Sequence, residues 1–262
     1  MTRRVGLVGW GAIGRTVGTA LAAGAVEGAE LVCVVDNRAI GEAPAPQLTF
    51  EEALERCDLI VEAAGQGVVR EWAERILRSG TDLLIASAGA LTDEELTKRL
   101  LDAGPGRVYV TAGAVGGLDL LQAARGLGPL HDVRLTTTKL PSTLEQPWMD
   151  AELLSRLRSA TGPVEVMAGT ARDIPVKFPK STNVAASVAL AVGDLDAVRV
   201  RVVADPGADR TRHLIEAEGP QGAYRFEVAH LPDPGNPATS RIVPYAVLRS
   251  IAAVAGRTGQ IL

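Results

Sequence analysis

Val5-Gly6-Leu7-Val8-Gly9-Trp10-Gly11-Ala12-Ile13-Gly14 begins close to the start of the chain, and a second apolar run at residues 31–35 ends at Asp36. A short apolar run followed by glycines and then by an Ala/Leu-rich segment predicts strand, turn and helix. Gly9 permits the tight turn, Gly11 lets a phosphate approach the backbone, and Gly14 lets the helix pack closely on the sheet. The pattern therefore predicts a βαβ unit that binds a dinucleotide at the helix N-terminus.

The acid that closes the second run predicts which dinucleotide binds. Asp36 lies 22 residues after Gly14, a spacing at which a carboxylate accepts hydrogen bonds from the adenosine ribose, so we predict NAD. Arg38 would instead suit a 2′-phosphate, which leaves NADP open. The cofactor contacts predicted in this region are Gly9, Gly11, Ala12, Ile13, Gly14, Asp36 and Asn37.

The first 112 residues alternate between short apolar runs and helical patterns. We predict strands at residues 5–8, 31–35, 59–63, 82–86 and 108–110, and helices at 14–23, 50–56, 68–79 and 92–103. This alternation predicts a doubly wound parallel sheet, a Rossmann domain over residues 1–112. Ligands of such sheets bind at the carboxyl ends of the strands. Further cofactor contacts are therefore predicted at Ala64, Gly65, Ser87, Ala88, Gly113 and Ala114.

From residue 113 the pattern changes to longer alternating segments. Period-two alternation predicts strands at residues 133–139, 198–203, 213–218 and 223–229, and helices are expected at 118–126 and 183–193. We predict a second α/β domain with a mixed or antiparallel sheet over residues 113–240. Residues 241–262, with a helix at 245–255, are expected to pack back on the first domain.

Composition narrows the class of protein. A net charge of −4 and an aromatic content of 3 % argue against nucleic acid as a partner. The chain has no run of 18 apolar residues, so no membrane span is predicted. Cys33 and Cys57 lie in apolar surroundings and are predicted to be buried free thiols. No metal-ligand spacing occurs, and the chain enters its first strand without a signal-peptide pattern, so we expect a cytoplasmic protein without a metal.

Four segments of the second half occur together in a recognisable order. They are Gly113-Ala-Val-Gly-Gly-Leu-Asp119; Ala168-Gly-Thr-Ala-Arg172 with Lys177-Phe-Pro-Lys180 and Asn183-Val-Ala-Ala; Val203-Ala-Asp-Pro206 followed by His213; and Asn236-Pro-Ala-Thr-Ser240. With the amino-terminal glycine motif, this set resembles the L-aspartate dehydrogenase family over nearly the whole chain.

The resemblance implies an activity. Members of this family carry out NAD(P)-dependent oxidative deamination of L-aspartate to iminosuccinate, which hydrolyses to oxaloacetate and ammonia or feeds NAD biosynthesis. It also implies a second domain that carries substrate residues and the dimer contact, so a homodimer or a larger homo-oligomer is expected. His213 matches the catalytic histidine of the family, and a base with a pKa near 7 suits deamination.

Polar residues near His213 and near a helix start are the expected substrate contacts, because a dicarboxylate needs hydrogen-bond donors for both ends. We predict substrate contacts at Thr170, Lys180, Asn183, Thr211, Thr239 and Ser240, and a cofactor contact at Asn236. The alternative interpretation for each is a turn, a helix cap or a solvated side chain.

One departure leaves the substrate open. The family commonly has Asn-x-His where this chain has Thr211-Arg212-His213, and a threonine cannot replace both ends of an amide. The alternatives are a related two-domain oxidoreductase, such as a homoserine dehydrogenase or a dihydrodipicolinate reductase, and a non-catalytic NAD(H)-binding regulator. Substrate-dependent formation of NADH separates an enzyme from a regulator.

Overall fold

The structure, a computed structural model, describes residues 2–179 and 183–256. The chain divides into two compact units. Unit 1 is formed by Met1–Gly113 together with Val243–Leu262, and unit 2 by Ala114–Ile242. The last helix of the chain therefore belongs to the same unit as the first 113 residues.

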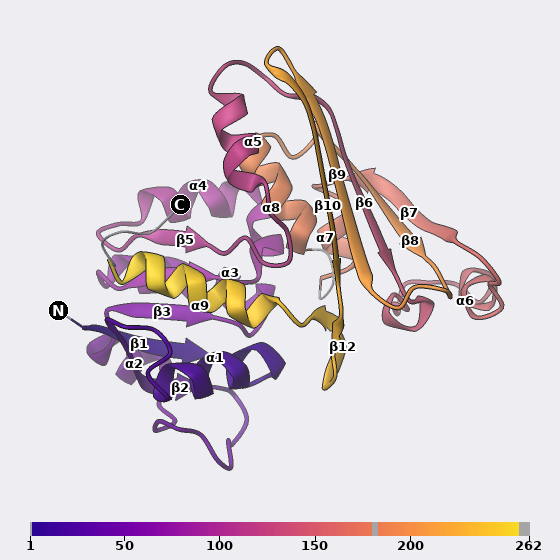
Figure 1. The fold of residues 1–262 in the computed structure, drawn as a ribbon. Helices are drawn as coiled ribbons and strands as arrows, with labels where there is room; N and C mark the ends of the chain where they lie inside the picture. Colours follow the sequence, from indigo (N-terminus) through magenta and orange to yellow (C-terminus); the bar gives the residue numbers. More distant parts are fainter. Residues whose placement is uncertain (1, 180–182, 257–262) are drawn as a thin grey trace. The chain divides into compact units, whose positions relative to one another are not determined.

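Unit 1 is built on a five-stranded parallel sheet with the order β2-β1-β3-β4-β5 (Figure 1). The chain starts in the middle of the sheet, runs outward to β2 and then returns to the other side of β1, which is the doubly wound order. The predicted Rossmann class is confirmed. The strands are β1 (Arg3–Val8), β2 (Ala29–Val35), β3 (Leu59–Glu62), β4 (Asp82–Ile85) and β5 (Val108–Val110).

Helices cover both faces of this sheet (Figure 1). On one face, Val17 of α1 and Val247 and Ile251 of α9 are fully buried against strand residues such as Leu7. Burial of each such side chain contributes roughly 1.5–3 kcal/mol. The helices are α1 (Ala12–Ala22), α9 (Val243–Val254), and, on the other face, α2 (Phe50–Arg56), α3 (Gln66–Arg78) and α4 (Glu94–Asp102).

The starts of two helices in unit 1 are fixed by side-chain caps. Thr49 caps α2: its hydroxyl accepts from Glu52 N at 3.2 Å, and the Glu52 carboxylate accepts from Thr49 N at 2.9 Å. The predicted start of the next helix at Thr92 is wrong. Thr92 closes the short 3₁₀ helix η1 (Ala88–Thr92), with its hydroxyl donating to Gly89 O, and Asp93 caps α4 instead.

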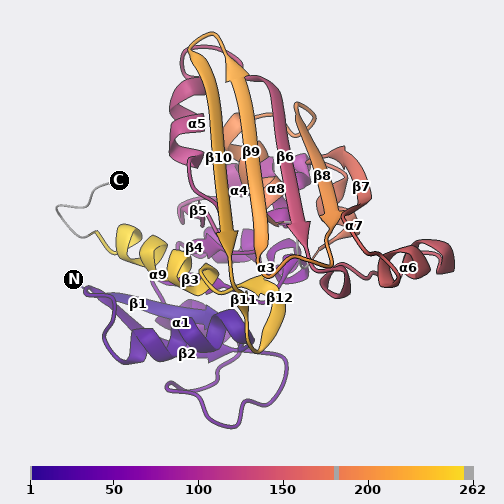
Figure 2. The same cartoon turned by 45° about the vertical axis from the view of Figure 1, so that its right-hand side comes forward.

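Unit 2 contains a mixed five-stranded sheet with the order β10-β9-β6-β8-β7, in which β6 and β8 are parallel (Figure 2). The predicted second α/β architecture is confirmed. Its strands are β6 (His131–Lys139), β7 (Val164–Thr170), β8 (Val198–Ala204), β9 (Thr211–Gly219) and β10 (Gly222–His230). Helices α5 (Leu118–Arg125) and α8 (Asn183–Val192) lie on one face (Figure 2), and the shorter elements are η2 (Pro141–Thr143), α6 (Ala151–Arg158) and α7 (Ile174–Lys177).

Two strands of unit 2 differ from the prediction. Strand β7 has a register shift between Glu165 and Met167, which breaks the alternation by which it could have been predicted. Residues 236–240, for which a turn is the alternative interpretation, form β12 (Asn236–Ser240), which pairs with β11 (Pro232–Asp233). The Asp233 carboxylate accepts from the N–H groups of Gly235 and Asn236 and so makes the turn of this hairpin.

The two cysteines and the apolar character of the helices were also predicted from the sequence. Cys33 and Cys57 are buried free thiols, as predicted, with their sulfur atoms 3.6 Å apart. Within the described ranges, no helix has both the length and the apolar character needed to cross a membrane.

The glycines of the first turn have separate packing roles. A Cβ added at Gly14 would lie 1.9 Å from Gly9 O, and one at Gly9, whose φ is +96°, would lie 2.8 Å from Ala63 O. A Cβ added at Gly11 would meet nothing within 4 Å. Gly9 and Gly14 therefore serve the fold, whereas the space beside Gly11 is open.

Gly14→Ala should destabilise unit 1 by roughly 1–3 kcal/mol or more, because the new methyl group overlaps a backbone carbonyl that cannot rotate away. Gly11→Ala is the matched control and should change the free energy of unfolding by about 1 kcal/mol or less, the scale of an altered helix cap. Urea unfolding of the wild type and both variants measures this, and equal losses in the two variants would contradict the assignment.

Candidate functional site

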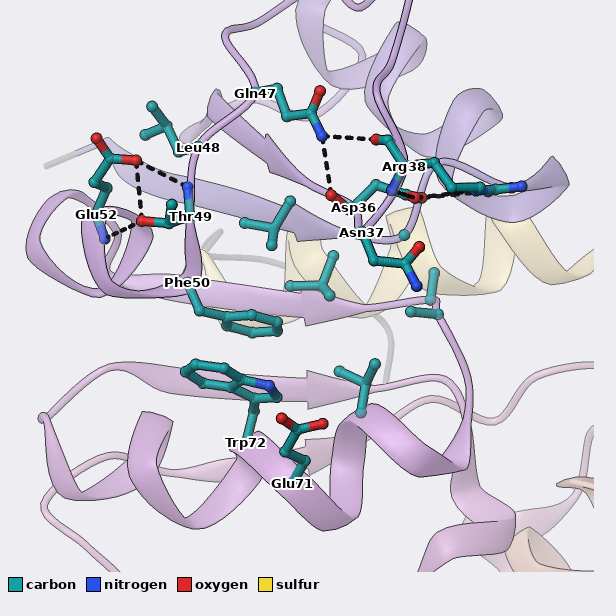
Figure 3. A pocket seen from close by; sticks show the side chains of 17 residues that line it. Asp36, Asn37, Arg38, Gln47, Leu48, Thr49, Phe50, Glu52, Glu71 and Trp72 are labelled. Atoms are coloured by element: carbon teal, nitrogen blue, oxygen red, sulfur yellow. Dashed lines mark hydrogen bonds and ion pairs between the residues drawn. The ribbon is translucent and has the colours of Figure 1, made fainter.

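A cavity of about 950 Å³ lies at the carboxyl edge of the unit 1 sheet, among the ends of β1, β2 and β3 and the helices α2 and α3 (Figure 3). This edge is where doubly wound sheets bind ligands. The structure brings together here several of the predicted cofactor residues, namely Gly9, Gly11, Asp36, Asn37 and Ala64. Ala12, Ile13 and Gly14 lie in the first turn of α1, directly after Gly11, which is its N-cap residue.

The carboxylate of Asp36 is fixed at the end of β2. Its Oδ2 accepts from Trp10 N at 2.8 Å, and its Oδ1 accepts from Arg38 N at 3.0 Å and from Arg38 Nε at 3.2 Å. Burial opposes ionisation of this side chain, but the hydrogen bonds from Arg38 and Trp10 outweigh it and hold the pKa at about 2. Asp36 is therefore a charged, preorganised acceptor at neutral pH.

A second cavity of about 390 Å³ adjoins Asp36 on the side of Arg38 and is also lined by Arg15. The Arg38 side chain is 74 % exposed and forms an ion pair with Asp36. Arg15 and Arg38 thus line the same cavity as Asp36, the carboxylate predicted to determine whether NAD or NADP binds.

An aromatic pair that the sequence analysis missed lines the larger cavity. Phe50 and Trp72 stack with ring centroids 3.9 Å apart and an angle of 6° between the rings (Figure 3). The Arg75 guanidinium lies 4.2 Å from the Trp72 centroid. Flat aromatic surface of this kind suits a heterocyclic ring. The available signal was a tryptophan between charged residues of a predicted helix, a position typical of a half-exposed ring.

Glu62, which the sequence analysis also missed, accepts hydrogen bonds from the loops that follow β3 and β4. The side chain is almost fully buried; its Oε1 accepts from Ala64 N at 2.8 Å, Gly65 N at 2.7 Å and Ser87 Oγ at 2.8 Å, and its Oε2 accepts from Ser87 N at 2.9 Å. Burial raises the pKa of Glu62 against the effect of these hydrogen bonds. The predicted residues Ala64, Gly65 and Ser87 are therefore held by one carboxylate, and Ala88 follows at the start of η1.

In unit 2 a set of buried polar side chains surrounds the predicted catalytic histidine. Their exposed fractions are 5 % or less, and we call them the polar cluster: Thr137, Lys139, Thr211, His213 and Ser240. His213 is paired with Thr137 across β9 and β6, and its Nδ1 lies 3.0 Å from the Thr137 hydroxyl oxygen. His213 does not face solvent at a sheet edge, because it is 2 % exposed and β9 lies between β10 and β6.

The environment keeps the imidazole of His213 neutral. Burial lowers its pKa, with further contributions from the positive charges of Lys139 and His230, to about 3. The unprotonated ring has a nitrogen that can accept a proton, but a pKa of about 3 makes it a weaker base than the group with a pKa near 7 that suits deamination.

Lys139 was not predicted as a site residue. It is 3 % exposed, and its Nζ donates to Ala238 O at 3.0 Å. Burial lowers its pKa to about 8. The signal was present in the sequence, because Lys139 continues the core-facing alternation of Val133, Leu135 and Thr137, where a lysine is unusual.

The hydrogen bond to Ala238 brings the β12 hairpin to the polar cluster. Ser240 is buried at the end of β12, and Thr239 accepts from Asn236 Nδ2 at 3.1 Å. Asn236 itself is exposed. The backbone of this segment therefore contacts Lys139. The Asn236 side chain instead forms its hydrogen bond within its own strand.

The remaining predicted residues occupy other positions. Asn183 is the first residue of α8 and is half-buried, and Lys180 lies outside the described residues. Gly113 ends unit 1 with a φ of +64°, whereas Ala114 begins unit 2, where its carbonyl accepts from His230 Nε2 at 2.9 Å.

Thr170 does not join the polar cluster. It ends β7, pairs with Arg199 toward the other end of the sheet, and donates its hydroxyl to Asp173 at 2.8 Å. Strand β7 lies three positions from β9 in the sheet, a distance of roughly 14 Å. Among the described residues, no group of three or more His, Cys, Asp or Glu side chains is placed to hold a metal ion.

The low pKa of His213 makes stability depend on pH. Because the folded pKa lies below that of an unfolded histidine, near 6.5, the stability associated with the neutral form is present above pH 6.5 and is lost as the pH falls toward 3. Between pH 7 and pH 5 the wild type should lose about 2 kcal/mol more than His213→Gln. Urea unfolding at both pH values measures the difference. His131→Gln, at an exposed histidine, should follow the wild type, and parallel slopes for all three proteins would contradict the burial argument.

Comparison with known proteins identifies relatives of both halves. Residues 119–254 match the family described as "Aspartate dehydrogenase, C-terminal", and residues 9–106 match "Homoserine dehydrogenase, NAD binding domain". L-aspartate dehydrogenase 2 of Bordetella bronchiseptica is 37 % identical over 96 % of each chain. L-aspartate dehydrogenase of Ruegeria pomeroyi is 43 % identical over 52 % of this chain and 48 % of its own.

Solved structures share the fold. Aspartate dehydrogenase from Thermotoga maritima superposes with a TM-score of 0.78 at 24 % identity over the full length of both chains. Scyllo-inositol dehydrogenase from Lactobacillus casei, solved with NAD(H) and scyllo-inositol, has a TM-score of 0.54 at 14 % identity over 97 % of this chain and 88 % of its own. Because the sequence match extends across both units, the chain belongs to the L-aspartate dehydrogenase family.

Proposed function

We propose that the protein catalyses the NAD-dependent oxidative deamination of L-aspartate to iminosuccinate. Iminosuccinate then either hydrolyses to oxaloacetate and ammonia or enters NAD biosynthesis. The observation that carries the proposal is the buried, neutral His213 beside a buried lysine in the unit that matches the aspartate dehydrogenase family. Relatives named L-aspartate dehydrogenase that align over 96 % of both chains support the same reaction.

The residues of unit 1 fit a nicotinamide dinucleotide. The open space beside Gly11 leaves room for a phosphate at the start of α1, and the ionised Asp36 is an acceptor for ribose hydroxyls. When bound, the cofactor supplies the acceptor for a hydride from the substrate. The residues proposed to hold it are Gly9, Gly11, Ala12, Ile13, Gly14, Asp36, Asn37, Ala64, Gly65, Ser87, Ala88, Gly113, Ala114 and Asn236.

The proposed chemistry of unit 2 depends on proton transfer at His213. Hydride loss from Cα requires the lone pair of the amino nitrogen, so the substrate ammonium must first lose a proton. The Thr137 hydroxyl holds the Nδ1 edge of the ring, and Nε2 is the proposed acceptor of that proton. After that proton has been released to solvent, the same nitrogen is again free to take a proton from the water that attacks the imine.

The proposed substrate residues are Asn183, Thr211, Thr239 and Ser240, with Lys180 retained from the sequence. We omit Thr170, because its hydroxyl is bonded to Asp173. We also propose a homodimer. No helix among the described residues covers the face of the unit 2 sheet opposite α5 and α8, which makes that face the proposed contact (Figure 2).

The reaction is tested by absorbance at 340 nm with NAD or NADP and a panel of L-amino acids, and in reverse with oxaloacetate and ammonia. We expect NADH formation with L-aspartate. His213→Ala should lower kcat by roughly 10²–10⁴-fold and leave NADH affinity nearly unchanged, because it removes a general base and none of the residues proposed to hold the cofactor. A wild-type protein that binds NADH and reacts with no amino acid would support the regulator instead.

The preference for NAD is tested separately. Asp36→Ala should weaken NAD binding by roughly 10–100-fold, the scale of lost hydrogen bonds to a charged group, while NADP binding falls less, because Arg38 is released toward the adjoining cavity. Fluorescence titration with NADH and NADPH measures both. Equal losses would show that Asp36 is not the ribose acceptor.

A further inference from the structure

Lys139 shares a buried face with His213. Alternate residues of β6, ending with Thr137 and Lys139, point to the covered side of the sheet, and Thr137 pairs with His213 on the neighbouring strand. Residues two apart on a strand lie roughly 7 Å apart. Lys139 is therefore the next residue on this face after Thr137, whose hydroxyl contacts the His213 imidazole.

The charge of Lys139 has no counter-ion in the part of the chain that the structure describes. Its one hydrogen bond there goes to the carbonyl of Ala238, which leaves two N–H groups of the ammonium. Asp205 and Asp233, the acids that follow β8 and end β11, accept instead from the N–H groups of Gly207 and Gly235. A buried cation is costly unless it is paired, so a retained one indicates that an anion binds beside it.

We propose that Lys139 binds a carboxylate of the substrate and holds that anion beside His213. The inference rests on the proposed function, because it names the group that recognises a dicarboxylic amino acid in that same site. An ammonium with two available donors is a compact partner for one carboxylate. An amino acid whose side chain lacks a carboxylate offers this site one anionic group fewer.

The proposal has a pH signature. With a pKa of about 8, Lys139 is mostly charged at pH 7 and mostly neutral at pH 9.5. The titratable groups on the same face of β9 and β10 are His213 and His230, and the pKa of about 3 keeps His213 neutral across this range. Affinity for a dicarboxylate should therefore fall between these pH values through Lys139.

The test is calorimetric titration of the NADH-bound protein with succinate, a dicarboxylate without the amino group. At pH 7, Lys139→Met should bind succinate roughly 10–100-fold more weakly than the wild type, because a charge-assisted pair is lost. From pH 7 to pH 9.5 the wild-type affinity should fall several-fold, and that of Lys139→Met should not. Lys98→Met removes the same charge from an exposed position in unit 1 and should behave as the wild type. Affinity in Lys139→Met within twofold of the wild type overturns the proposal.

A second measurement needs no variant. At pH 8.5 to 9, succinate binding to the wild type should take up a fraction of a proton, seen as a dependence of the binding enthalpy on the ionisation enthalpy of the buffer. Binding without proton uptake overturns the role of Lys139 even if Lys139→Met does not fold. Lys139→Arg, which keeps the charge, should retain more affinity than Lys139→Met.

The two proposals fail in distinguishable ways. NADH formation from L-aspartate together with normal succinate binding by Lys139→Met would overturn the role of Lys139 and leave the reaction intact. Succinate binding that depends on Lys139 in a protein that does not oxidise aspartate would support the carboxylate site and overturn the reaction. A wild type that binds no succinate overturns the carboxylate site.

Discussion

The carboxyl edge of a parallel sheet ends in loops whose N–H groups need acceptors, and two carboxylates meet this requirement in unit 1. Asp36 accepts from Trp10 N in the glycine turn, and Glu62 accepts from Ala64, Gly65 and Ser87 in the next two loops. Three loops remote in sequence are thereby fixed by two side chains at strand ends. The positions of the predicted cofactor residues depend on these bonds, because buried N–H groups without acceptors would destabilise the loop conformations.

In unit 2 the properties of the polar cluster depend on burial, whereas in unit 1 the loops are fixed by hydrogen bonds. The covered face of its sheet is apolar along most of β6 and becomes polar at Thr137 and Lys139, opposite His213 and near Thr211. Burial lowers the pKa of both His213 and Lys139, and the lysine charge lowers that of the histidine further. Burial therefore leaves an unprotonated imidazole and a mostly charged lysine on the same face of the sheet at neutral pH.

The sequence was sufficient for features that depend on short spacings. The glycine turn, Asp36, the doubly wound class of the first sheet and the presence of a mixed or antiparallel second sheet follow from local patterns, and the burial of His213 agrees with its place in an alternating run. It did not predict the stacking of Phe50 on Trp72, since that contact joins α2 to α3. Glu62 was hidden at the end of an apolar strand, and the bulge in β7 concealed the strand that places Thr170 away from His213.

The arrangement at Asp36 also bears on the proposed preference for NAD. The carboxylate is held by two backbone N–H groups, from Trp10 and Arg38, so it does not depend on the arginine side chain for its position. A 2′-phosphate would have to draw the exposed Arg38 guanidinium away from Asp36 and would then face a carboxylate whose pKa of about 2 keeps it ionised. The proposed discrimination against NADP would therefore come from repulsion as much as from the ribose hydrogen bonds. Because Arg38 partly neutralises the charge of Asp36, we propose that the two residues act together in selecting the cofactor.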